Sequence, residues 1–307
     1  MRPVLDTIRR GFDNVLANWP LLLIRIGESV AVVIVLVAGL LASIVPYLVS
    51  GVFTDFTTVS TPEEVFRALV LDHPFAILIW FVGFSATLIV AILLHSFVHA
   101  GIIGVYLDGE RAAGAAPVAP RSRFEQFSPD RWLAHSRRGM WPLFWIYNII
   151  WGVASLVLLF PILGAFAFIF LARDSPESMI AISCASVVFL LIAVIVVSMI
   201  AYLWSQLAII AAMRDSFGAV ESIRRGLGLF RERFASVVLV SVILFVISMA
   251  VGGVFSGVYF GFGLASAVDA VAIVTLPAQI ALSLVQSMVS VFTSSWLLAS
   301  LISAVQD

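Results

Sequence analysis

The chain has 307 residues, of which 62% are hydrophobic and only 11% are charged, whereas roughly a quarter of the residues in a typical soluble domain are charged. This composition excludes an ordinary soluble protein and indicates an integral membrane protein. With 17 arginines and 18 acidic residues the net charge is −1, so no overall positive field attracts nucleic acid. The single cysteine, Cys184, leaves no partner for a disulfide or a cysteine-based metal site.

Six stretches are apolar and long enough to cross a bilayer, which takes about 20 residues. An amphipathic segment, residues 1–20, precedes the first of them. We therefore predict an all-α fold, a single integral membrane domain over residues 1–307 with six transmembrane helices. Thr61-Pro62-Glu63-Glu64 also predicts the start of a short helix between the first two spans. The expected spans are about 21–50, 74–107, 141–172, 178–212, 236–263 and 272–305.

The arginines indicate which side of the membrane each loop faces. Residues 1–20, 107–140 and 213–235 contain 14 of the 17 arginines, and the alternate connections contain almost none. Because loops rich in arginine and lysine stay in the cytoplasm, we predict that both termini are cytoplasmic. The predicted location is the bacterial cytoplasmic (inner) membrane.

A short motif occurs twice on the predicted cytoplasmic side. Ile8-Arg9-Arg10-Gly11 is identical to Ile223-Arg224-Arg225-Gly226, and Ser136-Arg137-Arg138-Gly139 is a looser copy before the third span. The apolar residues around the first two copies share one helical face. We therefore predict amphipathic interfacial helices before spans 1, 3 and 5, in three parallel units of one such helix and one transmembrane hairpin. The alternative is that unrelated interfacial helices converged on the same residues. The arginines expected to contact anionic lipid headgroups or a protein partner are Arg9, Arg10, Arg137, Arg138, Arg224 and Arg225.

Several stretches resemble those of a broad group of bacterial six-span membrane proteins. They are Ala100-Gly101-Ile102-Ile103-Gly104 and Tyr106-Leu107-Asp108-Gly109-Glu110-Arg111, then Phe124 and Phe127, and later Met213-Arg214-Asp215 with the helix over 219–226. That group is similar to the membrane domain of glycerophosphoryl diester phosphodiesterases. The resemblance implies a membrane bundle without catalytic residues, because the phosphodiesterase chemistry belongs to a separate soluble domain.

Polar residues within the predicted spans are candidates for a site, because burying them in a membrane is costly. Counted from the cytoplasmic ends, four of them lie about 6 to 11 Å deep and two histidines lie at about 13 and 20 Å. Together these six could form one layer. In the functional interpretation this layer lines a pocket for a lipid headgroup or a small polar solute. In the alternative, Arg25 and Glu28 pair with each other on one helix and the remaining groups hold the helices together. The six residues are Arg25, Glu28, His95, His99, Asn148 and Gln206.

Metal and enzyme chemistry find little support in the sequence. His95 and His99 have the spacing of metal ligands, but only Glu28 is an obvious candidate to join them, which leaves a structural zinc site without its fourth ligand. No HExxH motif, phosphate-binding glycine loop, nucleotide fingerprint or nucleophile elbow is present. We therefore expect no metal, no cofactor and no enzymatic activity.

Two further patterns concern helix packing. Gly253, Gly257 and Gly261 form a stripe of small residues in span five, which predicts close packing within the bundle or, alternatively, contact between two copies of the chain. In span six a polar face runs from Gln279 to Ser294. This face could line a pathway, or its serines could bond to their own helix backbone.

Two functions remain after these exclusions. The first is a non-catalytic scaffold or accessory subunit that docks lipid or a partner through its cytoplasmic interfacial helices. The alternative is a permease for a lipid-like or small polar solute, using the intramembrane polar layer. A cavity lined by that layer would favour the permease.

Overall fold

The structure is a computed structural model that describes residues 3–50, 74–116, 119–171, 176–265 and 269–306. Within these residues there are eight α-helices, one short 3₁₀ helix and no β-strand, which confirms the all-α prediction. The helix predicted to begin near Thr61 lies outside the described residues. The elements are α1 (Val4–Ala17), α2 (Pro20–Ser50), α5 (Pro74–Ala113), η2 (Arg121–Phe124), α6 (Pro129–Leu171), α7 (Pro176–Asp215), α8 (Ala219–Glu232), α9 (Phe234–Ala265) and α10 (Asp269–Val305).

Six of these helices, α2, α5, α6, α7, α9 and α10, are long and apolar enough to cross a membrane. Each has at least 31 residues, or about 47 Å at 1.5 Å per residue, against about 30 Å for the hydrocarbon core. The chain is therefore a multi-pass membrane protein whose helices are longer than the hydrocarbon core is thick. The segment before span three is not a separate helix, because α6 runs without a break from Pro129 into the span. Gly139 lies inside this helix and is packed between Ala100 of α5 and Met213 of α7.

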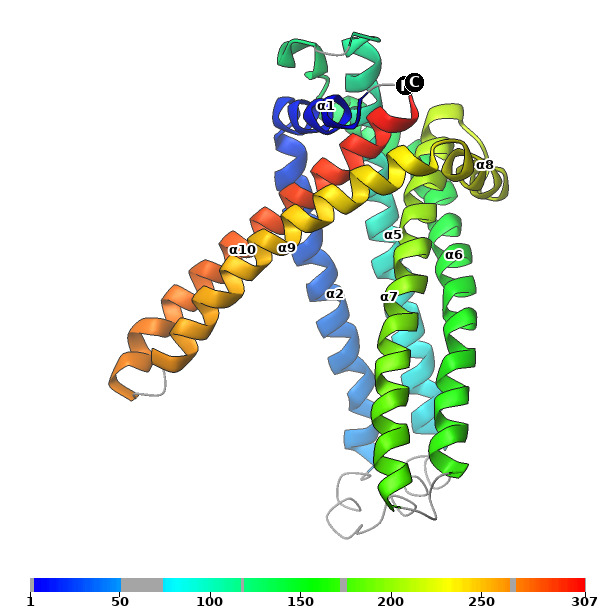
Figure 1. The fold of residues 1–307 in the computed structure, drawn as a ribbon, viewed down its shortest axis with the longest axis vertical. Helices are drawn as coiled ribbons and strands as arrows, with labels where there is room; N and C mark the ends of the chain where they lie inside the picture. The colour runs from blue at the N-terminus through cyan, green and yellow to red at the C-terminus, as the bar shows by residue number, and fades with distance from the viewer. Residues whose placement is uncertain (1–2, 51–73, 117–118, 172–175, 266–268, 307) are drawn as a thin grey trace.

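The helices form two groups (Figure 1). α2, α5, α6 and α7 run roughly along the long axis of the molecule, whereas the hairpin of α9 and α10 leaves that direction at an angle. Both chain termini lie at one end, which we call the terminal end, and α1 and α8 lie across it. Within the first group α5 packs against α2 and α6, and α6 packs against α7.

The fully buried apolar side chains are concentrated near the terminal end. There, residues of α5 such as Ile102 and Ile103 pack in one cluster with Leu207 of α7 and Ile302 of α10. Farther from this end the helices expose large apolar side chains, with Phe160 of α6 78% exposed. Exposed apolar side chains on membrane-spanning helices face lipid, so the packed core holds the terminal end together and lipid surrounds the rest.

α1 and α8 cross the ends of two different spans through matching contacts. Trp296 of α10 donates from Nε1 to the carbonyl oxygen of Ile8 at 2.8 Å, and Trp204 of α7 donates from Nε1 to that of Ile223 at 3.0 Å. Four residues beyond each tryptophan the backbones approach closely. A Cβ at Gly11 would lie 2.6 Å from the backbone nitrogen of Ser300 in α10, and one at Gly226 would lie 2.6 Å from the backbone nitrogen of Ala208 in α7. Both motif glycines therefore occupy positions where no side chain fits.

One arginine of the repeated motif is buried, which corrects the prediction that Arg10 contacts lipid. Arg10 is only 2% exposed. Its Nε donates to Glu110 Oε1 of α5 at 2.8 Å, its other nitrogens donate to the carbonyl oxygens of Gly114 and Ala116, and its guanidinium lies 5.1 Å from the centre of the Phe124 ring. Ser303 of α10 donates to the same Glu110 oxygen at 3.1 Å. A guanidinium with this many partners is stable away from water and lipid.

Candidate functional site

The candidate site lies between α2, α5, α6 and α7, on the side of the packed core that faces into the membrane. The sequence places its polar groups by helical spacing. Arg25 and Glu28 are three residues apart on α2, and His95 and His99 are four apart on α5, so each pair shares a helical face. α6 adds Tyr147 beside this histidine pair.

A chain of hydrogen bonds joins three of these helices. The Glu28 carboxylate contacts His95 Nδ1 across α2 and α5. His95 Nε2 lies 3.1 Å from the Tyr147 hydroxyl, which in turn lies 2.8 Å from His99 Nδ1. His95 Nε2 and His99 Nδ1 are 3.3 Å apart. The buried Glu28 carboxylate is thereby paired, and the rings of both histidines are held in fixed positions.

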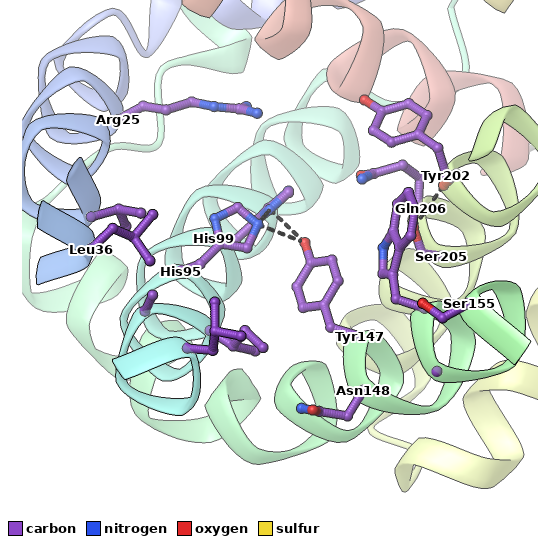
Figure 2. A pocket seen from close by; sticks show the side chains of 16 residues that line it. Arg25, Leu36, His95, His99, Tyr147, Asn148, Ser155, Tyr202, Ser205 and Gln206 are labelled. Carbon is purple, nitrogen blue, oxygen red and sulfur yellow. Dashed lines mark hydrogen bonds between the residues drawn. The ribbon is translucent and has the colours of Figure 1, made fainter. Parts of the chain in front are cut away.

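His95, His99 and Tyr147 border a cavity of about 610 Å³, which we call the central pocket (Figure 2). Its volume is within the roughly 300 to 1,000 Å³ of pockets that hold small ligands. Figure 2 shows Tyr147 pointing between His95 and His99 on one side and Gln206 and Tyr202 on the other. The residues that line the pocket are Arg25, Val32, Leu36, Leu88, Ala91, Ile92, His95, His99, Tyr147, Asn148, Trp151, Gly152, Ser155, Tyr202, Ser205 and Gln206.

The central pocket has a polar end and an apolar end. On α2 the lining changes from Arg25 to Val32 and Leu36, and on α5 it changes from His99 to Leu88. Eleven residues separate the ends of each series, which is about 16 Å along a helix axis. The polar end lies toward the terminal end. The lining therefore matches a molecule with a polar head and an apolar tail.

Two buried polar atoms at the polar end have no hydrogen-bond partner among the described residues. They are Nε2 of His99 and Oε1 of Gln206, in side chains only 3% and 4% exposed. A buried polar atom left unpaired costs about 1 to 3 kcal/mol, and such atoms in native proteins are usually satisfied by water or a ligand. One atom is a ring nitrogen and the other an amide oxygen, so this end can bond to both a hydroxyl and an amide.

Most of the predicted polar layer is brought together. Arg25, His95, His99, Asn148 and Gln206 all line the central pocket, whereas Glu28 is absent from the lining and contacts it through His95. The alternative pair of Arg25 and Glu28 is not formed within the described chain, because Arg25 NH1 donates to Ser295 of α10 at 3.2 Å. Asn148 bonds to its own helix, donating to the carbonyl oxygen of Phe144 at 2.8 Å.

Sequence reasoning missed part of the polar lining. Tyr147, Tyr202, Ser155 and Ser205 also border the pocket, but none carries a charge or an amide that would identify it in an apolar run. Their positions in the sequence could have identified the two tyrosines, because each lies near a residue of the predicted layer. Tyr147 is next to Asn148, and Tyr202 is one helical turn before Gln206.

The two helix-packing patterns have different outcomes. A Cβ at Gly253, Gly257 or Gly261 would meet nothing within 4 Å in the described part of the chain, so no helix packs closely on this stripe there, and contact between two copies of the chain stays a prediction. The stripe lies on α9 of the diverging hairpin, whose packing partner at this level is α10. In α10 the hydroxyls of Ser283, Ser287 and Ser294 donate to carbonyl oxygens of their own helix, as in the second interpretation of that face.

The other predicted arginines are exposed, unlike Arg10. Arg9 of α1, Arg137 and Arg138 of α6, and Arg224 and Arg225 of α8 all have exposed side chains. Among the described residues no group of three or more histidine, cysteine, aspartate or glutamate side chains is placed to hold a metal ion.

The fold and the site define a class, an all-α multi-pass membrane protein with a polar and apolar pocket among four of its helices. Comparison of the chain with protein-family models, curated proteins and solved structures found no match. The function therefore has to be inferred from the geometry of the site.

Proposed function

We propose that this chain is a non-enzymatic membrane protein that binds a lipid-like solute in the central pocket and acts as a permease for it. The observation that supports this most is the pair of unpartnered atoms, His99 Nε2 and Gln206 Oε1, at the polar end of a cavity among four helices. A polar head bound there satisfies both atoms. The tail then lies along Leu36 and Leu88, where apolar contact replaces contact with lipid.

Binding can be tested with two substitutions and one matched control. The full chain in nanodiscs is titrated with a dansyl-labelled fatty amide, whose N–H can donate to Gln206 Oε1 and whose carbonyl oxygen can accept from His99 Nε2. Emission from the dansyl group reports binding. His99→Phe combined with Gln206→Leu removes the two free atoms while keeping similar volumes. Each hydrogen bond contributes about 0.5 to 1.5 kcal/mol, so affinity should fall about tenfold. Gln279→Leu makes the same chemical change in α10, outside the pocket, and should leave affinity unchanged.

Two results would count against the proposal. Equal binding by the double variant and the unchanged chain would show that the head does not occupy the polar end. Binding that is normal but gives no movement of the labelled amphiphile across proteoliposomes would refute the permease and retain only a binding role. Flux that is lost in the double variant and kept in Gln279→Leu is the expected result.

A second candidate function is the scaffold or accessory subunit, which a different observation supports. Arg9, Arg137, Arg224 and Arg225 are exposed and belong to the segments that form the terminal end, where each arginine near an anionic surface contributes about 1 kcal/mol. Replacing these four by glutamine should reduce the anionic lipid that is retained in native mass spectrometry. Arg10 is left unchanged, because its role is structural. Unchanged lipid retention would remove this support.

The orientation and location remain the ones that the arginines favour. We propose that the terminal end faces the cytoplasm of a bacterium, in the inner membrane. Support comes from the exposed arginines that gather at this end together with both termini. The lone native cysteine, Cys184, is first replaced by alanine, and a new cysteine is placed at Arg224. An impermeant thiol reagent should label this position only in opened cells, and labelling in intact cells would reverse the orientation.

We further propose that the chain is a threefold repeat, as the shared motif suggests. The matched contacts of α1 with α10 and of α8 with α7 support two of the units. For the third, the start of α6 packs on α5, where the Phe97 and Trp132 rings are 5.7 Å apart and Gly101 abuts Ser136. Each interfacial segment thus crosses the last span of another unit, and α1 closes the ring on α10.

A further inference from the structure

A second, smaller cavity lies at the terminal end, where the end of α5, the first turns of α6 and the end of α7 meet. Its volume is about 110 Å³, well below the roughly 300 Å³ at which pockets for drug-sized ligands begin. Arginine and histidine supply most of its polar lining, so we call it the arginine pocket. Its polar residues are Arg111, His135, Arg138, Arg214 and Ser216.

Two carboxylates at this pocket are already paired with its cations. Asp108 Oδ2 lies 2.7 Å from His135 Nε2, and its other oxygen lies 3.6 Å from Arg111. Asp215 accepts two hydrogen bonds from Arg214, at 2.9 and 2.8 Å. Two carboxylates against three guanidiniums leave an excess of positive charge even with the histidine neutral.

Arg138 carries that excess. Its guanidinium has no carboxylate within salt-bridge distance in the described part of the chain, and its partner is the hydroxyl of Ser216. Ser216 has a φ of 61°, in the left-handed region that residues other than glycine seldom adopt. Strained residues of this kind are concentrated at ligand-binding sites. The backbone at Ser216 thus holds a hydroxyl beside a guanidinium that has no counter-charge.

The pocket lies next to the residues that mark a membrane interface. Pro142 belongs to its lining, and the neighbouring Trp141 and Trp145 are both more than half exposed. Exposed tryptophans on membrane proteins gather at the level of the lipid headgroups. The unpaired guanidinium is therefore at the depth where phosphate groups are most concentrated.

We propose that the arginine pocket binds a phosphate group, with Arg138 as its main cation. Guanidinium and phosphate form short, charge-assisted hydrogen bonds, Ser216 can donate a further one, and Arg111, which is half exposed, completes the positive side. The small volume admits the phosphate and excludes a larger body. This site is separate from the central pocket and does not depend on the function proposed for it. The phosphate belongs to a lipid headgroup or to a free phosphate ion.

The experiment uses the full chain in dodecyl maltoside micelles, whose sugar heads contain no phosphate. One arm titrates inorganic phosphate by calorimetry, and the other adds phosphatidic acid to the micelles. Binding in the first arm identifies free phosphate as sufficient, and binding in the second alone identifies a lipid headgroup. For whichever of the two ligands binds, Arg138→Gln should weaken its affinity tenfold or more, and Arg138→Lys should weaken it less. Arg123→Gln, at an exposed arginine of η2 that is not in the lining, should stay within twofold.

Two outcomes overturn the proposal. One is the absence of binding in both arms. The other is an equal loss in Arg123→Gln and Arg138→Gln, which would mean that general surface charge attracts the anion. Tryptophan emission and melting curves establish that each variant is folded. Should Arg138→Gln fail to fold, Arg111→Gln takes its place with the same expected loss, because the exposed side of that guanidinium carries little packing.

Discussion

Two adjacent arginines with opposite environments give the sharpest prediction for stability. Arg10→Ala removes a guanidinium that lies 2.8 Å from Glu110, whose side chain is only 1% exposed. It also removes donors to two backbone carbonyls and a ring contact. Removing one partner of a buried ion pair costs about 3 to 5 kcal/mol. Arg9 is exposed, so Arg9→Ala should change stability by no more than about 0.5 kcal/mol.

The two single variants are compared with a double variant by steric trapping, which measures the unfolding free energy in the membrane. Arg10→Met with Glu110→Gln removes both charges together and should cost less than Arg10→Ala alone, because no carboxylate then lies next to an empty cation site. Glu110 also accepts a hydrogen bond from Ser303 of α10. Loss of the Arg10–Glu110 pair should therefore weaken the packing of α10 at the terminal end. Similar losses in Arg9→Ala and Arg10→Ala would refute the reasoning, and so would a larger loss in the double variant than in Arg10→Ala.

Three further changes test packing and hydrogen bonding through the same unfolding measurement. Gly11→Ala puts a methyl group 2.6 Å from a backbone nitrogen of α10 and should destabilise by about 1 to 3 kcal/mol. Gly257→Ala meets nothing within 4 Å and should be neutral or stabilising by up to about 1 kcal/mol; a loss there would reveal a packing partner. Tyr147→Phe removes a hydroxyl bonded to both histidines and should cost about 1 kcal/mol. Trp296→Phe and Trp204→Phe remove matched bonds and should cost similar amounts, whereas a difference above about 1 kcal/mol would count against equivalent units.

The features that the sequence predicted well depend on local composition. Six spans follow from hydropathy alone, because each needs only about 20 apolar residues in a row. The depth of a polar residue follows from counting along its helix. Arg25, His99 and Gln206 could therefore be assigned to one level before their helices were known to be neighbours, and the structure places all three around one pocket.

The features that the sequence did not predict depend on which helices meet. Arg10 and Arg225 occupy the same position of an identical motif, yet only Arg10 is buried. Arg10 meets Glu110 from a distant part of the chain, whereas Arg225 meets Glu232 of its own helix at 3.2 Å, in contact with solvent. The motif glycines differ from the α9 glycines in the same way. The sequence shows glycine at regular positions in both sets. Only the structure shows that another backbone approaches Gly11 and that none approaches Gly257.

Close packing between α5 and α6 separates the two pockets and constrains the route into the central one. Gly101 abuts Trp132 and Ser136, and Gly104 abuts His135, so no side chain larger than hydrogen fits on α5 at these two positions. These glycines lie between His99, at the polar end of the central pocket, and Asp108, beside the arginine pocket. A head bound at His99 is therefore closed off from the terminal end along this helix pair. If the proposed amphiphile binds there, it therefore reaches the pocket by a route other than the one between α5 and α6 at this level.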